Sequence, residues 1–355
     1  MSLENYRNEI DETDAEIVQL IAKRIKVSEM IGQEKKGQGR NVRDMERENK
    51  VLNRVEKIAR DLGINDEDIK LVYRQIMAMS RSVQGVSVAF QGEIGAYSEQ
   101  AAFNYFGHTI DMKPCEKLED VFRAVEKGEV RFGVVPVENS LEGSISGTYD
   151  LLLDSILKVC GETDLRVIHS LIANPGVTMD SIKKVYSHPQ ALGQCQAFLK
   201  HLGTELVPTY DTAGSVKMIK DKGIMDGGAI ASSRAAEIYG MKIIAREIED
   251  NTNNYTRFFI LAKEDSPPTG NDKTSIVFSV KHRPGALYEL IKELADRKVN
   301  LTKIESRPTR QKPWEYNFYL DFDGHREDVK AREALSNLEQ YALFVKVLGS
   351  YPKAR

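Results

Sequence analysis

Four cations in the first fifty residues are well suited to binding a small acid. They are Arg7, Arg24, Lys35 and Arg47. Guanidinium groups bind carboxylates as two-pronged forks, and an ammonium group adds a point charge. Arg24 and Lys35 are eleven residues apart, about three helical turns, so in one helix they share a face and can reach one ligand. Arg7 precedes Arg24 by seventeen residues, roughly 25 Å along a helix, so in such a site it must come from a second chain.

Polar clusters farther along the chain are tied to apolar runs that are typical of strands. Asn139 follows the run 132–137, Gln190 follows the run 184–187, and Thr256 precedes the run 258–261. In open α/β sheets, strand ends and helix N-termini form the crevice that binds anionic ligands. The middle of the chain is therefore predicted to hold a second polar site.

The elements that position the first group of residues are predicted to be helices. From Ser2 to about Val83 there is no proline and no strand-like run, and apolar residues recur at helical spacing. The first helix spans over thirty residues, roughly 50 Å, which is longer than a three-helix domain of this size covers by itself. Its apolar stripe therefore needs a partner chain.

The rest of the chain is predicted to form two further domains. Short apolar strands alternate with helices from Val86 to about Lys263, and two similar segments, 121–139 and 216–233, indicate a two-lobed α/β domain. Residues 264–272 have the composition of a linker. The order β-α-β-β-α-β after them is typical of a ferredoxin-like fold.

Composition excludes several classes of protein. Hydrophobic residues make up 41% and charged residues 29% of the 355 residues, and the net charge of -3 is spread along the chain, which gives no reason to expect a nucleic-acid partner. No apolar segment has the length of a membrane span or the pattern of a secretory signal, so we expect a cytoplasmic protein with no membrane partner. Cys115, Cys160 and Cys195 are widely spaced and predict buried thiols, with neither a disulfide framework nor a metal site.

The helical segment resembles the all-helical chorismate mutases, in particular the form fused to prephenate dehydratase. The resemblance runs from Tyr6 to Gln84 and predicts an all-α mutase domain over residues 1–85. For any one of these residues a solvated helix face is the plainer interpretation, but eight positions match in order. The resemblance implies that they bind chorismate, with Lys35 and Gln84 donating to the ether oxygen, Arg7 supplied by the other protomer, and Glu48 holding the ring hydroxyl: Arg7, Arg24, Lys35, Asp44, Arg47, Glu48, Ser80 and Gln84.

The central segment resembles prephenate dehydratase through Pro136-Val-Glu-Asn-Ser140, Ser187-His-Pro-Gln190 and Thr256-Arg-Phe258. The resemblance implies a periplasmic-binding-protein-like domain over residues 86–264, in which Thr256 assists the leaving hydroxyl and Arg257 anchors a carboxylate. The serines at 232 and 233 are equally well explained as helix caps, and His188 is expected to be structural. The implied prephenate-binding residues are Asn139, Ser140, Ser144, Gln190, Gln194, Ser232, Ser233, Thr256, Arg257 and Phe258.

The C-terminal segment resembles the ACT domain attached to this enzyme, over residues 273–352. Two motifs carry the resemblance, His282-Arg-Pro-Gly-Ala-Leu287 and Glu305-Ser-Arg-Pro308. Glycine in the first motif lets backbone amides approach an amino acid at a helix start. The resemblance implies an allosteric phenylalanine site between two paired ACT domains, built by Gly285, Ala286, Leu287, Glu305, Ser306 and Arg307.

The three resemblances together imply one function. We expect a bifunctional enzyme of L-phenylalanine biosynthesis that converts chorismate to prephenate and prephenate to phenylpyruvate, with feedback inhibition by L-phenylalanine. No cofactor and no metal are expected, and the chain is predicted to form a homodimer or a dimer of dimers. Three alternatives remain: a two-lobed solute sensor without chemistry, a helical domain that regulates rather than catalyses, and an ACT domain that serves only for dimerisation.

Overall fold

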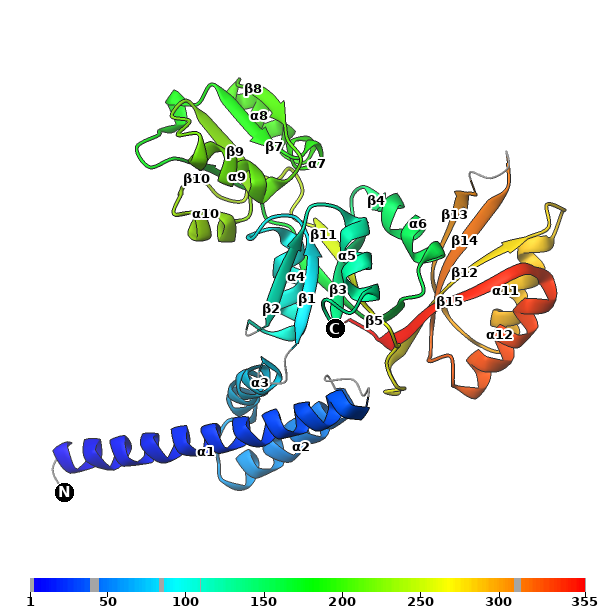
Figure 1. The fold of residues 1–355 in the computed structure, drawn as a ribbon, viewed down its shortest axis with the longest axis horizontal. Coiled ribbons are helices and arrows are strands. Elements are labelled where there is room, and N and C mark those ends of the chain that lie inside the picture. Colours follow the sequence, from blue (N-terminus) through cyan, green and yellow to red (C-terminus); the bar gives the residue numbers. More distant parts are fainter. Residues whose placement is uncertain (1–2, 39–44, 83–85, 109, 310–313, 355) are drawn as a thin grey trace. The chain divides into compact units, whose positions relative to one another are not determined.

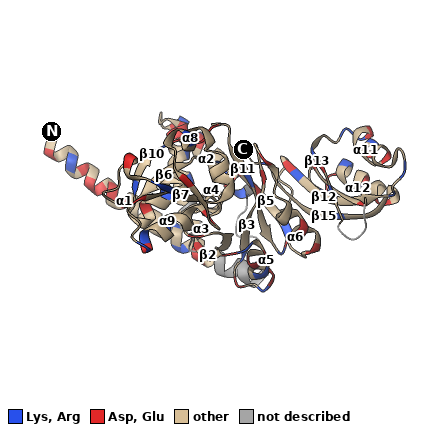
Figure 2. Cartoon of the chain, turned by 90° about the horizontal axis from the view of Figure 1, so that it is seen from above, with Lys and Arg blue, Asp and Glu red and all other residues tan. Residues whose placement is uncertain are grey.

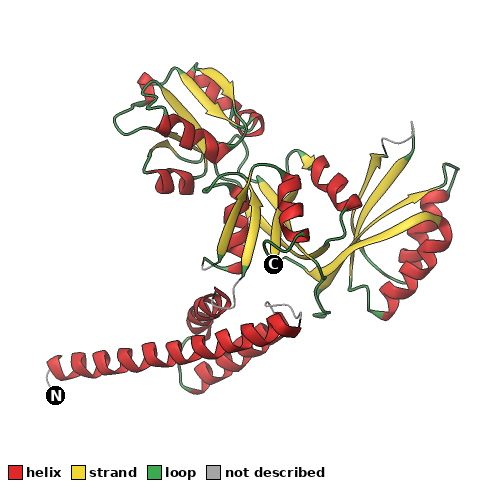
Figure 3. Ribbon diagram, viewed as in Figure 1, coloured by secondary structure: helices red, strands yellow, loops and turns green. Residues whose placement is uncertain are grey.

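The computed structural model describes residues 3–38, 45–82, 86–108, 110–309 and 314–354, apart from the side chains of 32–38, 45–46, 78 and 81–82. The chain divides into two compact units, one formed by residues 1–87 with 106–111 and the other by residues 88–105 with 112–355. Figure 1 labels the elements, and Figure 3 separates the all-helical first unit from the mixed second unit.

The first unit is built on one long helix, as its sequence predicts. The elements are α1 (Leu3–Gln38), α2 (Met45–Asp61) and α3 (Asp66–Ser82). Asn65 caps α3, because its side-chain oxygen accepts from the backbone N–H groups of Glu67 (2.9 Å) and Asp68 (3.3 Å). The side chains from Leu3 to Leu20 are exposed, and both signs of charge alternate along this half of α1 in Figure 2.

The first lobe of the second unit is a mixed sheet with helices packed on it. Its strands lie in the order β2-β1-β3-β11-β5, and β4 pairs with β3. β1 and β3 are parallel, whereas β11 runs antiparallel to both of its neighbours. The bounds are β1 (Ser87–Gln91), α4 (Tyr97–Phe106), β2 (Asp111–Cys115), α5 (Leu118–Glu126), β3 (Phe132–Asn139), β4 (Gly143–Ser144), α6 (Ser146–Asp154), β5 (Lys158–Arg166) and β11 (Tyr255–Ala262).

The second lobe is inserted between β5 and β11. Its strands lie in the order β10-β6-β9-β7-β8, with β7 parallel to both β8 and β9. The two crossover segments run together, since Val167 N–H donates to the Asn254 carbonyl over 2.8 Å and Ile248 N–H donates to the His169 carbonyl over 3.0 Å. The bounds are β6 (Ser170–Ala173), η1 (Met179–Ser181), β7 (Lys184–Ser187), α7 (Pro189–Gly193), α8 (Gln196–Leu202), β8 (Glu205–Pro208), α9 (Thr212–Asp221), β9 (Gly227–Ala231), α10 (Ser233–Tyr239) and β10 (Lys242–Ala245).

The C-terminal region has the predicted β-α-β-β-α-β order. Its antiparallel sheet has the strand order β13-β14-β12-β15, and α11 and α12 cover one face of it (Figure 1). The bounds are β12 (Asp272–Val280), α11 (Ala286–Asp296), β13 (Leu301–Pro308), β14 (Tyr316–Asp323), α12 (Val329–Tyr341) and β15 (Ala342–Pro352). The predicted multidomain fold class is thus confirmed.

The first lobe and the C-terminal sheet share one apolar core. Tyr319, Leu348 and Tyr351 are buried in the same cluster as Val135 and other side chains of the first lobe. Gly349 lies so close to β5 that a Cβ there would be 2.0 Å from the Val159 carbonyl oxygen. A side chain at position 349 would therefore push the two sheets apart.

Candidate functional site

Thr256 is held by a side chain from the neighbouring strand. β11 pairs with β3 so that Thr256 stands opposite Asn139. The Asn139 Oδ1 atom accepts from the backbone N–H groups of Leu141 (3.0 Å) and Glu142 (3.2 Å), which turns Nδ2 toward the Thr256 Oγ1 atom at 3.1 Å. Because Thr256 accepts this hydrogen bond, its own hydroxyl proton is available for donation to a ligand.

The same asparagine continues into a chain of hydrogen bonds at the junction of the two lobes. Asn139 Nδ2 donates to Asn254 Oδ1 over 2.7 Å, and Asn254 Nδ2 donates to Gln194 Oε1 over 2.8 Å. His169 Nε2 lies 2.9 Å from that oxygen, and its Nδ1 lies 2.9 Å from the Tyr97 hydroxyl. This series of hydrogen bonds thus joins both lobes to the segments that cross between them.

The members of this network are neutral at neutral pH. Burial lowers the pKa of His169 and raises the pKa of Tyr97 well above its ordinary value. Asn139, Asn254 and Gln194 carry amides, which do not titrate. Such a set fixes the direction of hydroxyl and amide donors but contains no strong acid, which suits the orientation of a leaving hydroxyl group.

Ser140 and Gln194 extend the network toward solvent. Ser140 Oγ donates to the Asn253 carbonyl over 2.7 Å and accepts from Tyr255 N–H over 2.9 Å, which holds the end of β3 to the start of β11. Gln194 Nε2 donates to Glu142 Oε1 over 2.9 Å. Asn139, Ser140, Gln194 and Thr256 are therefore the predicted residues that the structure brings together.

Ser232 has the capping position that was predicted as its alternative role, and His188 has a structural position as the cap of another helix. Ser232 Oγ accepts from Ala235 N–H over 3.2 Å at the start of α10, and it donates to the Gly95 carbonyl of the first lobe over 2.8 Å. Gly95 has φ +96°, and a Cβ there would lie 3.0 Å from the Ala235 Cα atom, so this close approach of the lobes requires glycine. Ser233 is the first residue of α10. His188 caps α7, with Nδ1 accepting from Gln190 N–H over 3.3 Å.

Arg257 departs from the prediction that it anchors a substrate carboxylate. Successive residues of a strand point to opposite faces, so Arg257 lies behind Thr256. Each of its side-chain nitrogens donates to a protein group: Nε to Glu162 (2.8 Å), and the two terminal nitrogens to Asp321 (2.8 Å) and to the Tyr351 hydroxyl (3.0 Å). Two of these three partners belong to the C-terminal sheet, so this arrangement does not fit a substrate ligand.

Ser144 and Phe258 also lie apart from the Asn139–Thr256 pair. The Ser144 hydroxyl donates to Glu305 and accepts from Lys303 Nζ over 2.7 Å, so it faces the C-terminal sheet. Phe258 is buried in the first lobe, with 2% of its surface exposed. The predicted roles of both side chains in binding prephenate gain no geometric support.

The first unit gathers part of the predicted chorismate site around Arg24. The guanidinium of Arg24 donates to Ser80 Oγ and, over 3.4 Å, to the Ile76 carbonyl. Burial lowers the pKa of Arg24, whereas Tyr73 and Glu48 act in the opposite direction, which places the Glu48 carboxylate near this cation. The structure therefore joins Arg24 of α1 to Ser80 of α3 by a hydrogen bond, and the Glu48 carboxylate of α2 acts to raise the pKa of the same guanidinium.

The other predicted chorismate-binding residues either are exposed or lie outside the described part of the chain. Arg7 lies in the exposed half of α1, and Arg47 is exposed on α2. Asp44, Gln84 and the Lys35 side chain lie outside the described residues. Their roles stay predictions.

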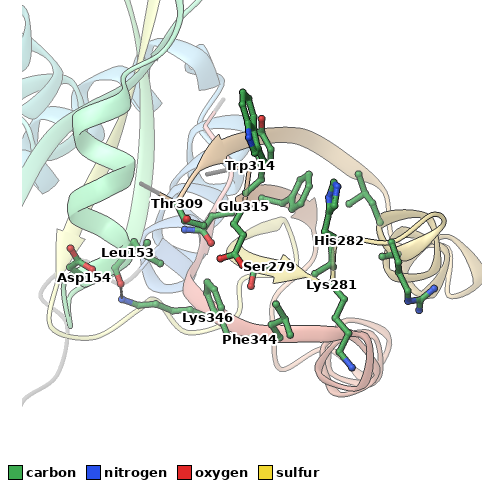
Figure 4. A pocket seen from close by; sticks show the side chains of 18 residues that line it. Leu153, Asp154, Ser279, Lys281, His282, Thr309, Trp314, Glu315, Phe344 and Lys346 are labelled. Carbon is green, nitrogen blue, oxygen red and sulfur yellow. Dashed lines mark hydrogen bonds between the residues drawn. The ribbon is translucent and has the colours of Figure 1, made fainter. Parts of the chain in front are cut away.

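The first predicted phenylalanine motif borders a hollow of about 700 Å³ in the C-terminal region (Figure 4). Gly285 has φ +80° and directly precedes α11, a backbone conformation that favours glycine. The second motif does not line the hollow: Glu305 contacts Ser144, and Arg307 donates to Asp150 over 3.0 Å. The hollow is lined by Ala286 and Leu287 together with residues that include His282, Arg283, Trp314, Asn317, Phe344 and Lys346.

Three side chains of the network were missed as site residues. Asn254 stands two residues before the Thr256-Arg-Phe258 motif and Tyr97 directly precedes Ser98, so polar neighbours in the sequence were a usable signal for both. His169 lies between an apolar pair and a buried strand, and nothing in the sequence separates it from an ordinary core histidine.

Two negative findings concern the described part of the chain. Among those residues no group of three or more His, Cys, Asp or Glu side chains is placed to hold a metal ion. No helix there has both the length and the apolar character needed to span a bilayer.

Sequence models of three families match consecutive parts of the chain. Chorismate mutase type II matches residues 6–85, prephenate dehydratase matches residues 88–266, and the ACT domain matches residues 274–340. Two catalytic domains are thus followed by a domain of a regulatory class.

Known proteins carry the same combination. The bifunctional chorismate mutase/prephenate dehydratase of Aquifex aeolicus is 38% identical over 99% of this chain and 98% of its own length. Arogenate dehydratase/prephenate dehydratase 2 of Arabidopsis thaliana is 46% identical over 75% of this chain and 73% of its own length. A prephenate dehydratase from Arthrobacter aurescens, solved in complex with L-Phe, superposes with a TM-score of 0.70 at 32% identity and covers 76% of this chain and 90% of its own. The chain belongs to the bifunctional chorismate mutase/prephenate dehydratase family, and it is an enzyme with both activities.

Proposed function

We propose that the two reactions of this enzyme take place at two separate groups of residues, one around Arg24 and one around Thr256. The observation that carries the proposal is the Asn139–Thr256 hydrogen bond of 3.1 Å, which leaves the threonine proton free at the junction of the lobes. Prephenate loses its ring hydroxyl together with its carboxylate, so an oriented donor to the departing hydroxyl lowers the barrier. Neither reaction needs a cofactor or a metal in this scheme.

The mutase reaction is a rearrangement within one molecule, and it requires positioning rather than a nucleophile. Arg24 supplies a partly buried cation for a chorismate carboxylate, and Ser80 fixes the direction of the guanidinium. Glu48 is proposed to hold the ring hydroxyl. Asp44, Arg47, Lys35 and Gln84 complete the proposed site, with the last two donating to the ether oxygen as charge develops there.

The mutase site is proposed to be shared between two chains. Ile10, Ile17 and Leu20 on the exposed half of α1 have 59%, 49% and 65% of their surfaces exposed, and a second α1 would cover them. The same pairing brings Arg7 of one protomer to Arg24 of the other. The proposed assembly is a homodimer or a dimer of dimers in the cytoplasm.

L-Phenylalanine is the proposed ligand of the C-terminal region and inhibits the dehydratase reaction. The Arthrobacter aurescens relative was solved with L-Phe, and the hollow beside Ala286 and Leu287 in this chain has apolar and polar walls suited to an amino acid. Glu305, Ser306 and Arg307 are proposed to border the ligand where two ACT domains pair, since Glu305 and Arg307 contact Ser144 and Asp150 of their own chain rather than the hollow.

A coupled assay tests the proposal. Purified protein supplied with chorismate is expected to release phenylpyruvate, with prephenate as the intermediate, and the Thr256→Ala variant is expected to stop at prephenate. L-Arogenate should be tested in the same assay as a second candidate substrate of the dehydratase, because one relative is named for it. Prephenate that persists with wild-type protein would support a sensor without chemistry, whereas turnover of prephenate but not chorismate would support a helical domain with a regulatory role.

A further inference from the structure

Two side chains directly behind the Asn139–Thr256 pair are held by the C-terminal sheet. In the β3–β11 register, Glu138 stands opposite Arg257, one residue from Asn139 and one from Thr256. Because strand side chains alternate, this second pair lies on the back face of the site. Any shift of the second pair along the strands shifts the first.

Arg257 is the first point of attachment. Its guanidinium is bound by Glu162 of β5, and by Asp321 and Tyr351 of the C-terminal sheet. Lys273 Nζ donates to Glu162 Oε1 over 2.8 Å, so two cations and two carboxylates balance each other. The side chains of Glu162 and Asp321 are only 2% and 5% exposed, so loss of one member leaves a buried charge without compensation.

Glu138 is the second point of attachment. Lys303 of β13 forms an ion pair with it at 3.0 Å and donates to Ser144 Oγ over 2.7 Å. Ser144 in turn donates to Glu305, which lies in the predicted phenylalanine motif. A ligand that changes the position of Glu305 therefore acts on Lys303 and, through it, on Glu138.

We propose that Arg257 and Glu138 are positioning residues that transmit the state of the C-terminal domain to Asn139 and Thr256. Arg257 binds no substrate in this assignment. Effector binding at β13 and β14 changes how Lys303 and Asp321 hold the back pair, and the Thr256 hydroxyl loses its alignment with the leaving group. The inference rests on the proposed dehydratase activity and its inhibition by phenylalanine.

A substrate-binding role for Arg257 and a purely structural role for the ion pairs each predict a different outcome. If Arg257 were a substrate ligand, Asp321 would only orient its guanidinium, and loss of Asp321 would raise KM for prephenate. If the ion pairs were merely structural, their loss would lower stability without affecting inhibition. A coupling role instead lowers kcat at nearly constant KM and separates phenylalanine binding from inhibition.

Asp321→Asn is the central test, with Asp323→Asn as its matched control. Asp323 lies two residues on in β14, on the same face, and is bound to Lys353 (2.8 Å) and Asn300 (2.9 Å) rather than to Arg257. For Asp321→Asn we expect kcat for prephenate to fall about tenfold with KM within about twofold. Calorimetry should show phenylalanine binding within about twofold of wild type, while saturating phenylalanine inhibits less than about twofold. The control should be inhibited as wild type is.

Two further measurements keep the result interpretable. Mutase activity of the same sample and circular dichroism report folding. Lys303→Met removes the cation that holds Glu138, whose carboxylate also lies 3.7 Å from a terminal nitrogen of Arg257. The same loss of inhibition is expected for this variant. Full inhibition of both folded variants, or an Arg257→Gln variant with raised KM and unchanged kcat, would overturn the inference. Absence of prephenate turnover or of phenylalanine inhibition in wild-type protein would instead refute the proposed function on which it rests.

Discussion

Asn139 donates to Thr256 from a position that its own backbone neighbourhood fixes. The side-chain oxygen of Asn139, Oδ1, accepts from the backbone N–H groups of Leu141 and Glu142, so the side-chain amide cannot reverse without losing both hydrogen bonds. The orientation of the Thr256 hydroxyl is thus decided before substrate binds. This is preorganisation of a donor, which commonly contributes more to catalysis than the donor's acidity.

Replacing Asn139 by aspartate tests that relationship. Aspartate keeps the size of the side chain but accepts rather than donates toward Thr256, so the hydroxyl proton turns back to the carboxylate. We expect kcat for prephenate to fall by about 100-fold, and mutase activity to stay normal. Steady-state kinetics on both substrates measure this. A variant with normal prephenate turnover would remove Asn139 from the orienting role.

Arg24→Ala should abolish most of the mutase activity and leave the dehydratase activity intact. Removal of a charged partner of a substrate carboxylate predicts a loss in kcat/KM of at least about 100-fold. Lys23→Ala is the matched control, since Lys23 is the neighbouring cation on α1 and is exposed. Equal loss of both activities in a folded variant would contradict the assignment of two separate sites.

Mixed dimers test the contribution of Arg7. Chains with Arg7→Ala and chains with Arg24→Ala are each expected to be inactive as mutases. After exchange of subunits, one of the two shared sites in a heterodimer has both arginines, so part of the activity should return. Verified heterodimers that stay inactive would place Arg7 outside the site.

Because His169 is buried, we expect the free energy of unfolding to fall on acidification. Its folded-state pKa is lowered by burial, so below the ordinary value of 6.5 the unfolded chain takes up a proton that the folded chain refuses. The contribution of His169 to the free energy of unfolding is fully present above that pH and falls as the pH decreases through it. His169→Gln should show a flatter pH dependence than wild type in urea unfolding between about pH 7.5 and 5.5. Parallel curves for the two proteins would show that His169 does not set this dependence.

Gly285→Val should remove the response to phenylalanine and leave turnover without it nearly normal. A branched side chain blocks backbone approach at the start of α11 and disfavours φ +80°. Gly270→Val is the control, because Gly270 has φ +85° and open space around it but lies outside the lining of the hollow. Calorimetry and inhibition curves compare phenylalanine binding and inhibition in the two variants. Phenylalanine binding that survives in Gly285→Val would show that the ligand does not bind at the start of α11.

The sequence was sufficient for the fold because periodicity and turn residues are local signals. The helix of 36 residues, the two-lobed alternation of strands and helices, and the β-α-β-β-α-β order all follow from such patterns. What the sequence could not predict is the face of the sheet on which a strand residue lies. Thr256 and Arg257 are neighbours in one motif, yet they point in opposite directions, and the partners of Arg257 come from segments 64 and 94 residues away.

The shared core has a consequence for synthesis of the chain. The apolar cluster of the first lobe contains Val135 and Phe259, but it is completed by Leu348 and Tyr351 in the last strand. During synthesis this part of the lobe stays exposed until residue 351 has left the ribosome. The helical unit consists of residues 1–87 and 106–111, so all of its segments have been synthesised long before that point. A ribosome stalled within α12 would therefore carry a folded mutase unit and a first lobe whose apolar flank is still open to chaperones.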